Sequence, residues 1–340
     1  MKPPLLKFLV NLILLIFLTT TAFTQKTELK IMTVTGEMPA SEMGVTLPHE
    51  HVLVDFIPVD SITPNRWNRD SVVVKVLPFF EQLKRYQVKT FVDCTPEFLG
   101  RDPLMLAMLS RKSNIKILTN TGWYAADKER HLPSGMDSMT SAEIARFWID
   151  EAKNGIENSG IRPGFIKIGV NNMVLSEKDK KLVEAACRTH LATGLTIMSH
   201  TGLGEAALAQ LKILKKFGVD PSAFIWTHAY RETSDERFME IYRMGAWIAL
   251  DGIRAGKSMD QIVTRLKYLK SQGALNRVLL SHDAGWYDPA KPGGGTIRPF
   301  TDLFTSLLPK LLNEGFIQAD FDQLMVKNPS EAFGIRVRKD

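Results

Sequence analysis

Residues 46–52 read TLPHEHV, and the two histidines in this stretch decide how the rest of the chain is interpreted. His49 and His51 are two of only seven histidines in the chain. Side chains two residues apart lie on the same face of a β-strand, whereas on a helix they would point in different directions. The H-x-H spacing therefore predicts a strand whose two imidazoles can bind one metal ion.

Seven further β-rich runs follow this one, and segments with an apolar spacing typical of helices lie between them. The eight runs occupy residues 44–56, 88–96, 115–124, 164–172, 195–202, 224–230, 247–253 and 277–286. Helices are expected, for example, over residues 141–160 and 177–194, with Gly194 as the C-cap residue of the second. This alternation predicts an α/β fold in which a parallel sheet closes into a (β/α)8 TIM barrel. No linker rich in Pro, Gly or Ser interrupts residues 26–340, so we expect one domain there.

The N-terminus has the pattern of a signal peptide, which we predict over residues 1–25. Lys2 and Lys7 precede an apolar run at residues 8–18, and small and polar residues follow. The run is shorter than the roughly 20 residues that a transmembrane helix needs. A retained N-terminal anchor is the alternative. We expect an exported protein, periplasmic or secreted, with no stable membrane span after cleavage.

Charge and cysteine usage exclude other classes of protein. The formal net charge is +6, and no basic cluster with interleaved aromatic residues is present, so nucleic acid is not an expected partner. The only cysteines, Cys94 and Cys187, lie in separate apolar elements, and we expect both to be free.

Polar residues that suit metal ions fall at the ends of the predicted strands, where a TIM barrel builds its active site. With His49 and His51, these residues are Lys167, His200, His228 and Asp283. Each has a structural explanation when taken alone, such as a core hydrogen bond for a histidine or a helix cap for the aspartate. Their convergence on one rim predicts a site for divalent metal ions, with zinc as the expected metal.

Lys167 has a special place in this set, because it lies in the buried run FIKIGV at residues 165–170. Burial lowers the pKa of a lysine and frees its amine. A free amine can add CO2 to form a carbamate, whose two oxygens can bridge two cations. We therefore expect N6-carboxylation of Lys167. The remaining histidines receive other interpretations: His131 on the surface, His190 as a structural residue in a helix, and His282 facing away from Asp283.

Several short motifs follow one another along the chain. G-x-T-L-x-H-E-H spans residues 44–51, D-C-T spans 93–95 and G-R-D spans 100–102. The later motifs are G-I-x-x-x-G-I-R-x-G-F-I-K-I at 155–168, S-H-T at 199–201, T-H at 227–228, L-D at 250–251, S-H-D-x-x-W at 281–286 and N-P-S-E-A-F at 328–333. Over residues 32–335 the chain resembles the phosphotriesterase family of the amidohydrolase superfamily, which includes lactonase-like and phosphotriesterase-related members.

The resemblance implies a TIM barrel with two divalent metal ions, usually zinc, and a hydroxide that bridges them. His49, His51 and Asp283 would bind the more buried ion, His200 and His228 the more exposed ion, and carboxylated Lys167 would bridge both. The hydroxide would attack a carbonyl or phosphoryl centre, and Asp283 would carry the proton to the leaving group. Relatives are often homodimers, so a homodimer is a further expectation.

Departures from the family pattern bear on the substrate. Members that hydrolyse phosphotriesters have an aspartate after strand six and a histidine after strand seven, which move protons. In this chain Arg231 stands near the first position and Gly252 near the second, so the relay is absent by motif. Tyr124 stands where lactonase-like relatives carry tyrosine, and its hydroxyl can bond to a substrate oxygen. These departures favour a small lactone or related carboxyl ester as substrate.

Other residues of this rim are candidates for substrate binding. Arg231 and Arg254 suit an anionic group, although either could instead pair with Glu232 or Asp251. Trp286 is expected to wall the leaving-group pocket or to serve packing alone. Three alternatives stay open: hydrolysis of phosphotriesters or other phosphoesters, hydrolysis of amides, and a metal-binding relative that has lost catalysis.

Overall fold

The computed structural model describes residues 28–340, and each of the eight predicted β-rich runs contains a strand. The strands of the barrel are β3 Val45–Leu53, β4 Val88–Asp93, β5 Lys116–Leu118, β6 Asn120–Thr121, β7 Phe165–Gly169, β8 Ile197–His200, β9 Phe224–Thr227, β10 Trp247–Leu250, β11 Val278–Leu280 and β12 Gly285–Tyr287. The predicted signal peptide over residues 1–25 lies outside the described residues.

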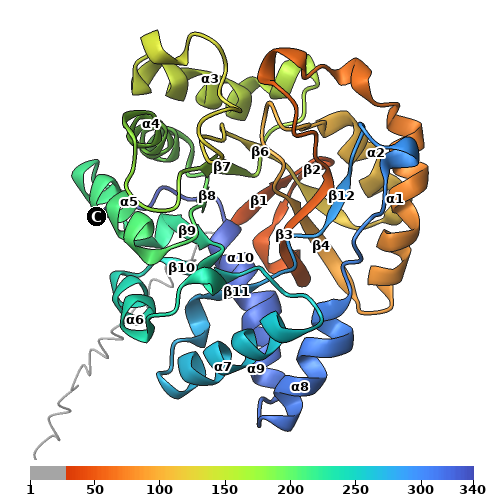
Figure 1. Cartoon of the computed structure of the whole chain (residues 1–340), viewed down its shortest axis with the longest axis vertical. Coiled ribbons are helices and arrows are strands. Elements are labelled where there is room, and N and C mark those ends of the chain that lie inside the picture. The colour runs from red at the N-terminus through yellow and green to blue at the C-terminus, as the bar shows by residue number, and fades with distance from the viewer. Residues whose placement is uncertain (1–27) are drawn as a thin grey trace, which may run out of the picture.

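The strands form two sheets that follow one another around the centre of the molecule (Figure 1). One runs in the order β11-β10-β9-β8-β7-β6, the other in the order β12-β3-β4-β5, and every neighbouring pair is parallel. Only Thr119 separates β5 from β6. At the other seam, the backbone N–H groups of Asp283 and His51 donate to the carbonyl oxygens of His49 and Ala284, at 3.0 and 2.9 Å. The architecture is the predicted TIM barrel.

Helices surround the strands (Figure 1). They are α1 Arg69–Lys84, α2 Pro103–Ser113, α3 Ser141–Asn154, α4 Glu177–Thr193, α5 Gly204–Lys216, α6 Asp235–Met244, α7 Lys257–Ser271, α8 Leu308–Asn313, α9 Gln318–Asp322 and α10 Asn328–Phe333. Helices α3 and α4 begin with capping boxes on Thr140 and Ser176, and the C-cap residue of α4 is Gly194, as predicted, with a φ of 76°. None of the helices in residues 28–340 is both long enough and apolar enough to cross a bilayer.

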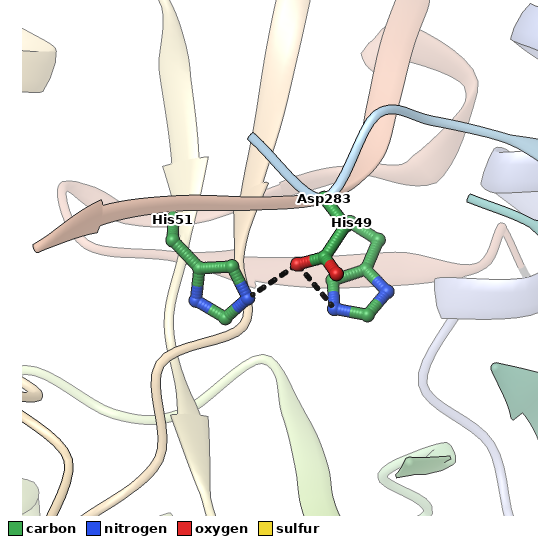
Figure 2. Close-up of side chains that lie close together, drawn as sticks. All are labelled: His49, His51 and Asp283. Carbon is green, nitrogen blue, oxygen red and sulfur yellow. Dashed lines mark ion pairs between the residues drawn. The ribbon is translucent and has the colours of Figure 1, made fainter. Parts of the chain in front are cut away.

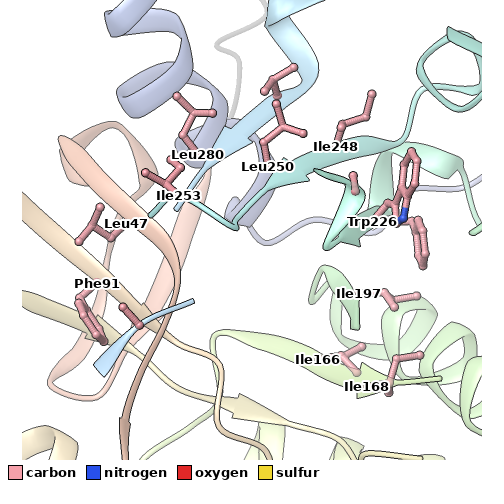
Figure 3. Close-up of a cluster of buried hydrophobic side chains, with 14 of the residues drawn as sticks. Leu47, Phe91, Ile166, Ile168, Ile197, Trp226, Ile248, Leu250, Ile253 and Leu280 are labelled. Carbon is pink, nitrogen blue, oxygen red and sulfur yellow. The ribbon is translucent and has the colours of Figure 1, made fainter. Parts of the chain in front are cut away.

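Alternation along the strands divides the core into an outer and an inner layer. Ile166 and Ile168 of β7 belong to the outer layer, between strands and helices, with residues such as Trp226 and Ile248 (Figure 3). Phe165 of the same strand belongs to an inner cluster to which other strands also contribute. The inner face of β7 therefore carries Phe165 first and Lys167 two residues later, so the inward direction of Lys167 follows from the strand period.

A hairpin and the last helix close the N-terminal end of the barrel. The strands β1 Lys30–Thr33 and β2 Gly36–Pro39 pair antiparallel, and Ile31 joins the inner cluster. Phe333 of α10 packs against Phe165 with ring centroids 5.5 Å apart. With this end filled by apolar side chains, the opposite end is left for a functional site.

An irregularity in β3 directs its histidines inward. Leu47 pairs with Phe91 of β4 and Glu50 pairs with Asp93, so β3 carries one residue more than β4 between these pairs. Such a bulge reverses the side-chain alternation that follows it. Leu47 packs in the outer layer, and after the bulge His49 and His51 face the barrel interior. The bulge coincides with Pro48, which cannot donate a backbone hydrogen bond.

Candidate metal centre

The six residues that the sequence predicts as metal ligands line one cavity at the C-terminal end of the strands. The cavity has a volume of about 120 Å3, and Tyr124, Arg231 and Trp286 contribute to its wall. Arg254 does not line this cavity but an adjoining one, which it shares with Arg231 and Trp286. The structure thus brings all the predicted ligand and substrate-binding residues to one cavity except Arg254, which lines the adjoining cavity.

His49, His51 and Asp283 point toward a common centre (Figure 2). The Nε2 atoms of His49 and His51 lie 3.8 and 3.1 Å from Oδ1 of Asp283. Burial alone would raise the pKa of Asp283, but the hydrogen bond to His51 and the charge of His49 outweigh it, and the pKa lies below its usual range. Asp283 has a φ of 55°, in the left-handed region that residues other than glycine rarely adopt. This unusual backbone turns a charged carboxylate toward the two histidines.

His200 and His228 form the other half of the centre. Nε2 of His228 lies 2.8 Å from Nδ1 of His200, and the ring centroids are 4.4 Å apart. The Tyr124 hydroxyl lies 3.2 Å from Nδ1 of His200. Burial lowers the pKa of His200 well below its usual value, with the charge of His228 as the next cause. Neutral imidazole is the form that binds a metal ion.

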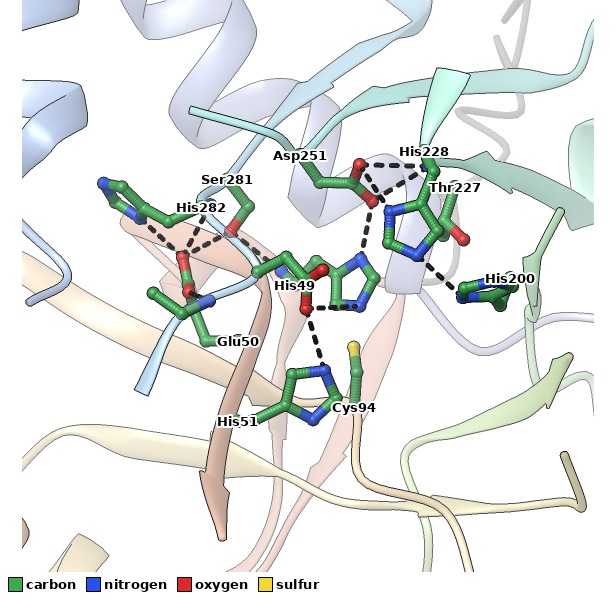
Figure 4. A network of polar contacts seen from close by, with 12 residues as sticks. His49, Glu50, His51, Cys94, His200, Thr227, His228, Asp251, Ser281 and His282 are labelled. Atoms are coloured by element: carbon green, nitrogen blue, oxygen red, sulfur yellow. Dashed lines mark hydrogen bonds and ion pairs between the residues drawn. The ribbon is translucent and has the colours of Figure 1, made fainter. Parts of the chain in front are cut away.

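Asp251 connects the two halves from behind (Figure 4). Its Oδ2 lies 2.6 Å from Nδ1 of His49, and its Oδ1 lies 3.1 Å from Nδ1 of His228. When a carboxylate accepts the Nδ1–H of a histidine, Nε2 is left unprotonated and directed toward the metal. Asp251 therefore presents one nitrogen of each histidine to the cavity. From the sequence, Asp251 is expected only as a partner for the arginines, although the L-D motif at residues 250–251 contains it.

Lys167 is the residue that tests whether the site fits two cations. Its side chain is 2 % exposed, and Nζ has no hydrogen-bond partner among the described residues. Burial lowers its pKa, which favours the neutral amine. An unpartnered amine at the bottom of a cavity lined by histidines and a carboxylate fits a carbamate that holds metal ions, because a buried polar atom without a partner is costly. The donor set of imidazoles and carboxylate fits divalent ions such as zinc.

Glu50, between the two histidines, supports the centre from the opposite face of β3. Its Oε1 accepts hydrogen bonds from the Ser281 hydroxyl at 2.8 Å and the His282 backbone N–H at 2.9 Å, and contacts Nδ1 of His282 at 2.6 Å. Its Oε2 accepts from the Ala284 N–H at 2.8 Å. Glu50 thereby fixes the backbone on both sides of Asp283. The sequence reasoning missed this role.

The other histidines follow the sequence predictions in two cases and depart from them in one. His282 bonds to Glu50 and does not line the metal-ligand cavity, and His190 is buried against Leu195 and the C-terminal segment. His131 is not on the surface, as predicted, but is 4 % exposed. The loop after Tyr124 folds back, and the His131 ring packs 5.6 Å from that of Phe56 and 6.1 Å from that of Tyr124. Cys94 and Cys187 are free and buried, as expected.

The alternative that Glu232 and Asp251 neutralise the arginines is not realised. Asp251 bonds to histidines, and Glu232 accepts hydrogen bonds from the backbone N–H groups of Gly204, Thr233 and Ser234.

The Tyr230 ring explains why residue 252 is a glycine. A Cβ atom on Gly252 would lie 2.6 Å from that ring. A larger side chain at the position of the family's relay histidine would therefore displace Tyr230.

The model of the phosphotriesterase family matches residues 29–333. The chain belongs to the phosphotriesterase family. It is 27 % identical over 295 residues to the phosphotriesterase homology protein of Escherichia coli, covering 85 % of this chain and 98 % of that protein. It is 23 % identical over 350 residues to the N-acetyltaurine hydrolase of Danio rerio, covering 88 % and 96 %.

Among solved structures, the organophosphorus hydrolase from Deinococcus radiodurans superimposes with a TM-score of 0.80 at 27 % identity. The match covers 91 % of this chain and 98 % of that one. The family relation identifies the chain as a hydrolase, and the family is binuclear and metal-dependent. The histidine and aspartate groups described above could bind such ions.

Proposed function

We propose that this protein is a binuclear zinc hydrolase that opens lactones or related carboxyl esters. His49, His51 and Asp283 would hold one ion, and His200 and His228 the other, with carboxylated Lys167 between them. Two divalent ions in such a site supply a Lewis acid and a nucleophilic hydroxide near neutral pH.

The residues of the chain contribute to this reaction in separate ways. The Tyr124 hydroxyl, beside His200, is placed to donate a hydrogen bond to an oxygen of the substrate. The Asp283 carboxylate accepts a proton and returns it to the leaving alkoxide. Trp286, whose ring lies 5.6 Å from that of Phe56, forms part of the cavity wall against which a substrate would pack.

The observation that carries the choice of substrate is Gly252 beneath the Tyr230 ring. Gly252 has no side chain, so the chain lacks a proton-carrying group at the position where phosphotriester-hydrolysing relatives have a relay histidine. A lactone needs less of such a relay, because its leaving alkoxide stays attached and is close to Asp283.

Two other substrates have support from named relatives. The likeness to an organophosphorus hydrolase favours phosphotriesters or other phosphoesters. The relative named N-acetyltaurine hydrolase favours an amide, whose carbonyl the same nucleophile can attack. A non-catalytic metal-binding relative is the remaining alternative.

A substrate panel tests the proposal. The mature, zinc-loaded protein is assayed for kcat/KM on a γ-lactone, a δ-lactone, an aryl ester, a phosphotriester and an N-acetyl amide. We expect the lactones to lead and Asp283→Asn to abolish their turnover. A higher kcat/KM for the phosphotriester or the amide would overturn the choice of substrate.

We also propose that the protein is exported after cleavage near residue 25 and that it forms a homodimer. Fractionation of cells that express the full chain or a chain without residues 1–25 tests the first point. Light scattering tests the second.

A further inference from the structure

A second cavity adjoins the metal-ligand cavity, and three arginines contribute to its wall. It has a volume of about 300 Å3, and its lining includes Arg231, Arg254 and Arg298 as well as Asp283 and Trp286. Arg231, Asp283 and Trp286 line both cavities, so the two spaces are neighbours. A substrate bound at the metal centre could therefore extend a substituent into the second cavity.

The arginines of the second cavity have no carboxylate partner. Within residues 28–340, none of the three forms an ion pair at 4.0 Å or less. The Nε of Arg231 donates only to the Tyr230 hydroxyl, at 3.4 Å. The guanidinium of Arg298 donates to backbone carbonyls, among them those of Asp283 at 2.9 Å and Ile253 at 3.3 Å.

The two aspartates of this wall act on Arg231 only through their charge at longer range, because their side-chain contacts are with histidines of the metal centre. Asp251 bonds to His49 and His228, and Asp283 to His51. Burial lowers the pKa of Arg298, and the nearby charge of Arg254 lowers it further. Three guanidinium groups that face one space repel one another, and an anion bound between them would lower that repulsion.

We propose that this cavity is a subsite for an anionic group, a carboxylate or a phosphate, carried by the substrate of the hydrolase. The inference rests on the function proposed above and adds a substrate class to it. Arg231 and Arg254 bind the anion, since a planar guanidinium can donate two parallel hydrogen bonds to a carboxylate or phosphate. Arg298 is a positioning residue. By bonding to Ile253 and Asp283 it fixes the segment that precedes Arg254 relative to the metal centre.

A matched pair of substrates tests the subsite. The probes are 5-oxotetrahydrofuran-2-carboxylate and its carboxamide, which share one lactone ring and differ in charge. We expect wild-type kcat/KM to be about ten- to a hundredfold higher for the carboxylate, the range for hydrogen bonds to a charged group. In Arg254→Gln this ratio should fall toward one. Arg146→Gln on α3, which removes an exposed arginine far from the centre, should keep the wild-type ratio. Equal rates for the two probes in the wild type, or an unchanged ratio in Arg254→Gln, would overturn the subsite.

Direct binding separates a failure of the subsite from a failure of the lactonase proposal. If neither lactone is hydrolysed, the proposed function fails, and calorimetry of succinate and inorganic phosphate with the metal-free protein decides the subsite. Binding that is at least tenfold weaker in both Arg254→Gln and Arg231→Gln would support it. Equal affinity for wild type and both variants would contradict it. Because Arg231 and Arg254 are exposed, neither substitution should impair folding.

Discussion

Residues that hydrogen-bond to the candidate ligands determine whether those ligands are oriented to bind a metal ion. Asp251 contacts the Nδ1 atoms of both His49 and His228, although it is distant from each in the sequence. It therefore sets which nitrogen of each imidazole faces the cavity, and it holds two ligands of different strands in one arrangement.

Asp251→Asn should weaken metal binding by about ten- to a hundredfold, the usual effect of losing a carboxylate behind a metal-bound histidine. His49 and His228 contact different oxygens of Asp251, and the amide nitrogen that replaces one of them in asparagine donates and cannot accept, so one imidazole loses its acceptor. Competition with a chromophoric chelator measures the affinity. Asp150→Asn on the exposed side of α3 is the control and should bind zinc like the wild type. Unchanged affinity in Asp251→Asn would show that this carboxylate does not orient the histidines.

At the scale of elements, the join between β3 and the β11–β12 segment holds the centre together. Glu50 on β3 accepts hydrogen bonds from the backbone N–H groups of His282 and Ala284, which flank Asp283. This explains how Asp283 keeps its left-handed backbone conformation, since the segment on either side is fixed.

Glu50→Gln should destabilise the fold by about 1–3 kcal/mol, because an amide group replaces one acceptor oxygen and leaves a buried donor unpaired. Urea unfolding of the metal-free protein measures this loss. Glu42→Gln, at an exposed position just before β3, should leave the free energy of unfolding unchanged. If both variants unfold alike, the hydrogen bonds of Glu50 add nothing to stability.

Much of the element pattern could be predicted from the sequence, because apolar periodicity reports burial directly. The eight β-rich runs and helix α4 appear where the periodicity places them, and α3 begins at Ser141 as predicted but ends at Asn154, before Gly155 with its φ of 98°. The bulge at Pro48 and the roles of Glu50 and Asp251 could not be predicted in the same way. They depend on contacts between segments some 200 residues apart, which local spacing does not encode. The burial of His131 could not be predicted for a related reason, since it comes from the packing of a loop against Phe56.

For the whole molecule, the metal centre joins strands from every part of the barrel. His49, Lys167, His200, His228 and Asp283 lie on or after five different strands, β3, β7, β8, β9 and β11. Ions bound at this point would stabilise the closed barrel, because ligands from distant segments converge only in the folded chain.

Removal of metal should therefore lower the stability of the whole protein. A ligand present at a thousandfold excess over its Kd contributes about 4 kcal/mol to the folded state. We expect dialysis against a chelator to lower the Tm and zinc to restore it, as measured by calorimetry. In Asp283→Asn the response to zinc should be smaller. A Tm that is the same with and without chelator would contradict a bound metal.

The central claim is that two metal ions lie between these histidines and a carboxylated Lys167. The most direct measurement is a crystal structure of the zinc-loaded protein with anomalous data collected at the zinc edge. We expect two anomalous peaks, one beside His49, His51 and Asp283 and one beside His200 and His228, with additional density on Nζ of Lys167 that contacts both. A single peak, or an unmodified lysine amine beside two ions, would contradict it.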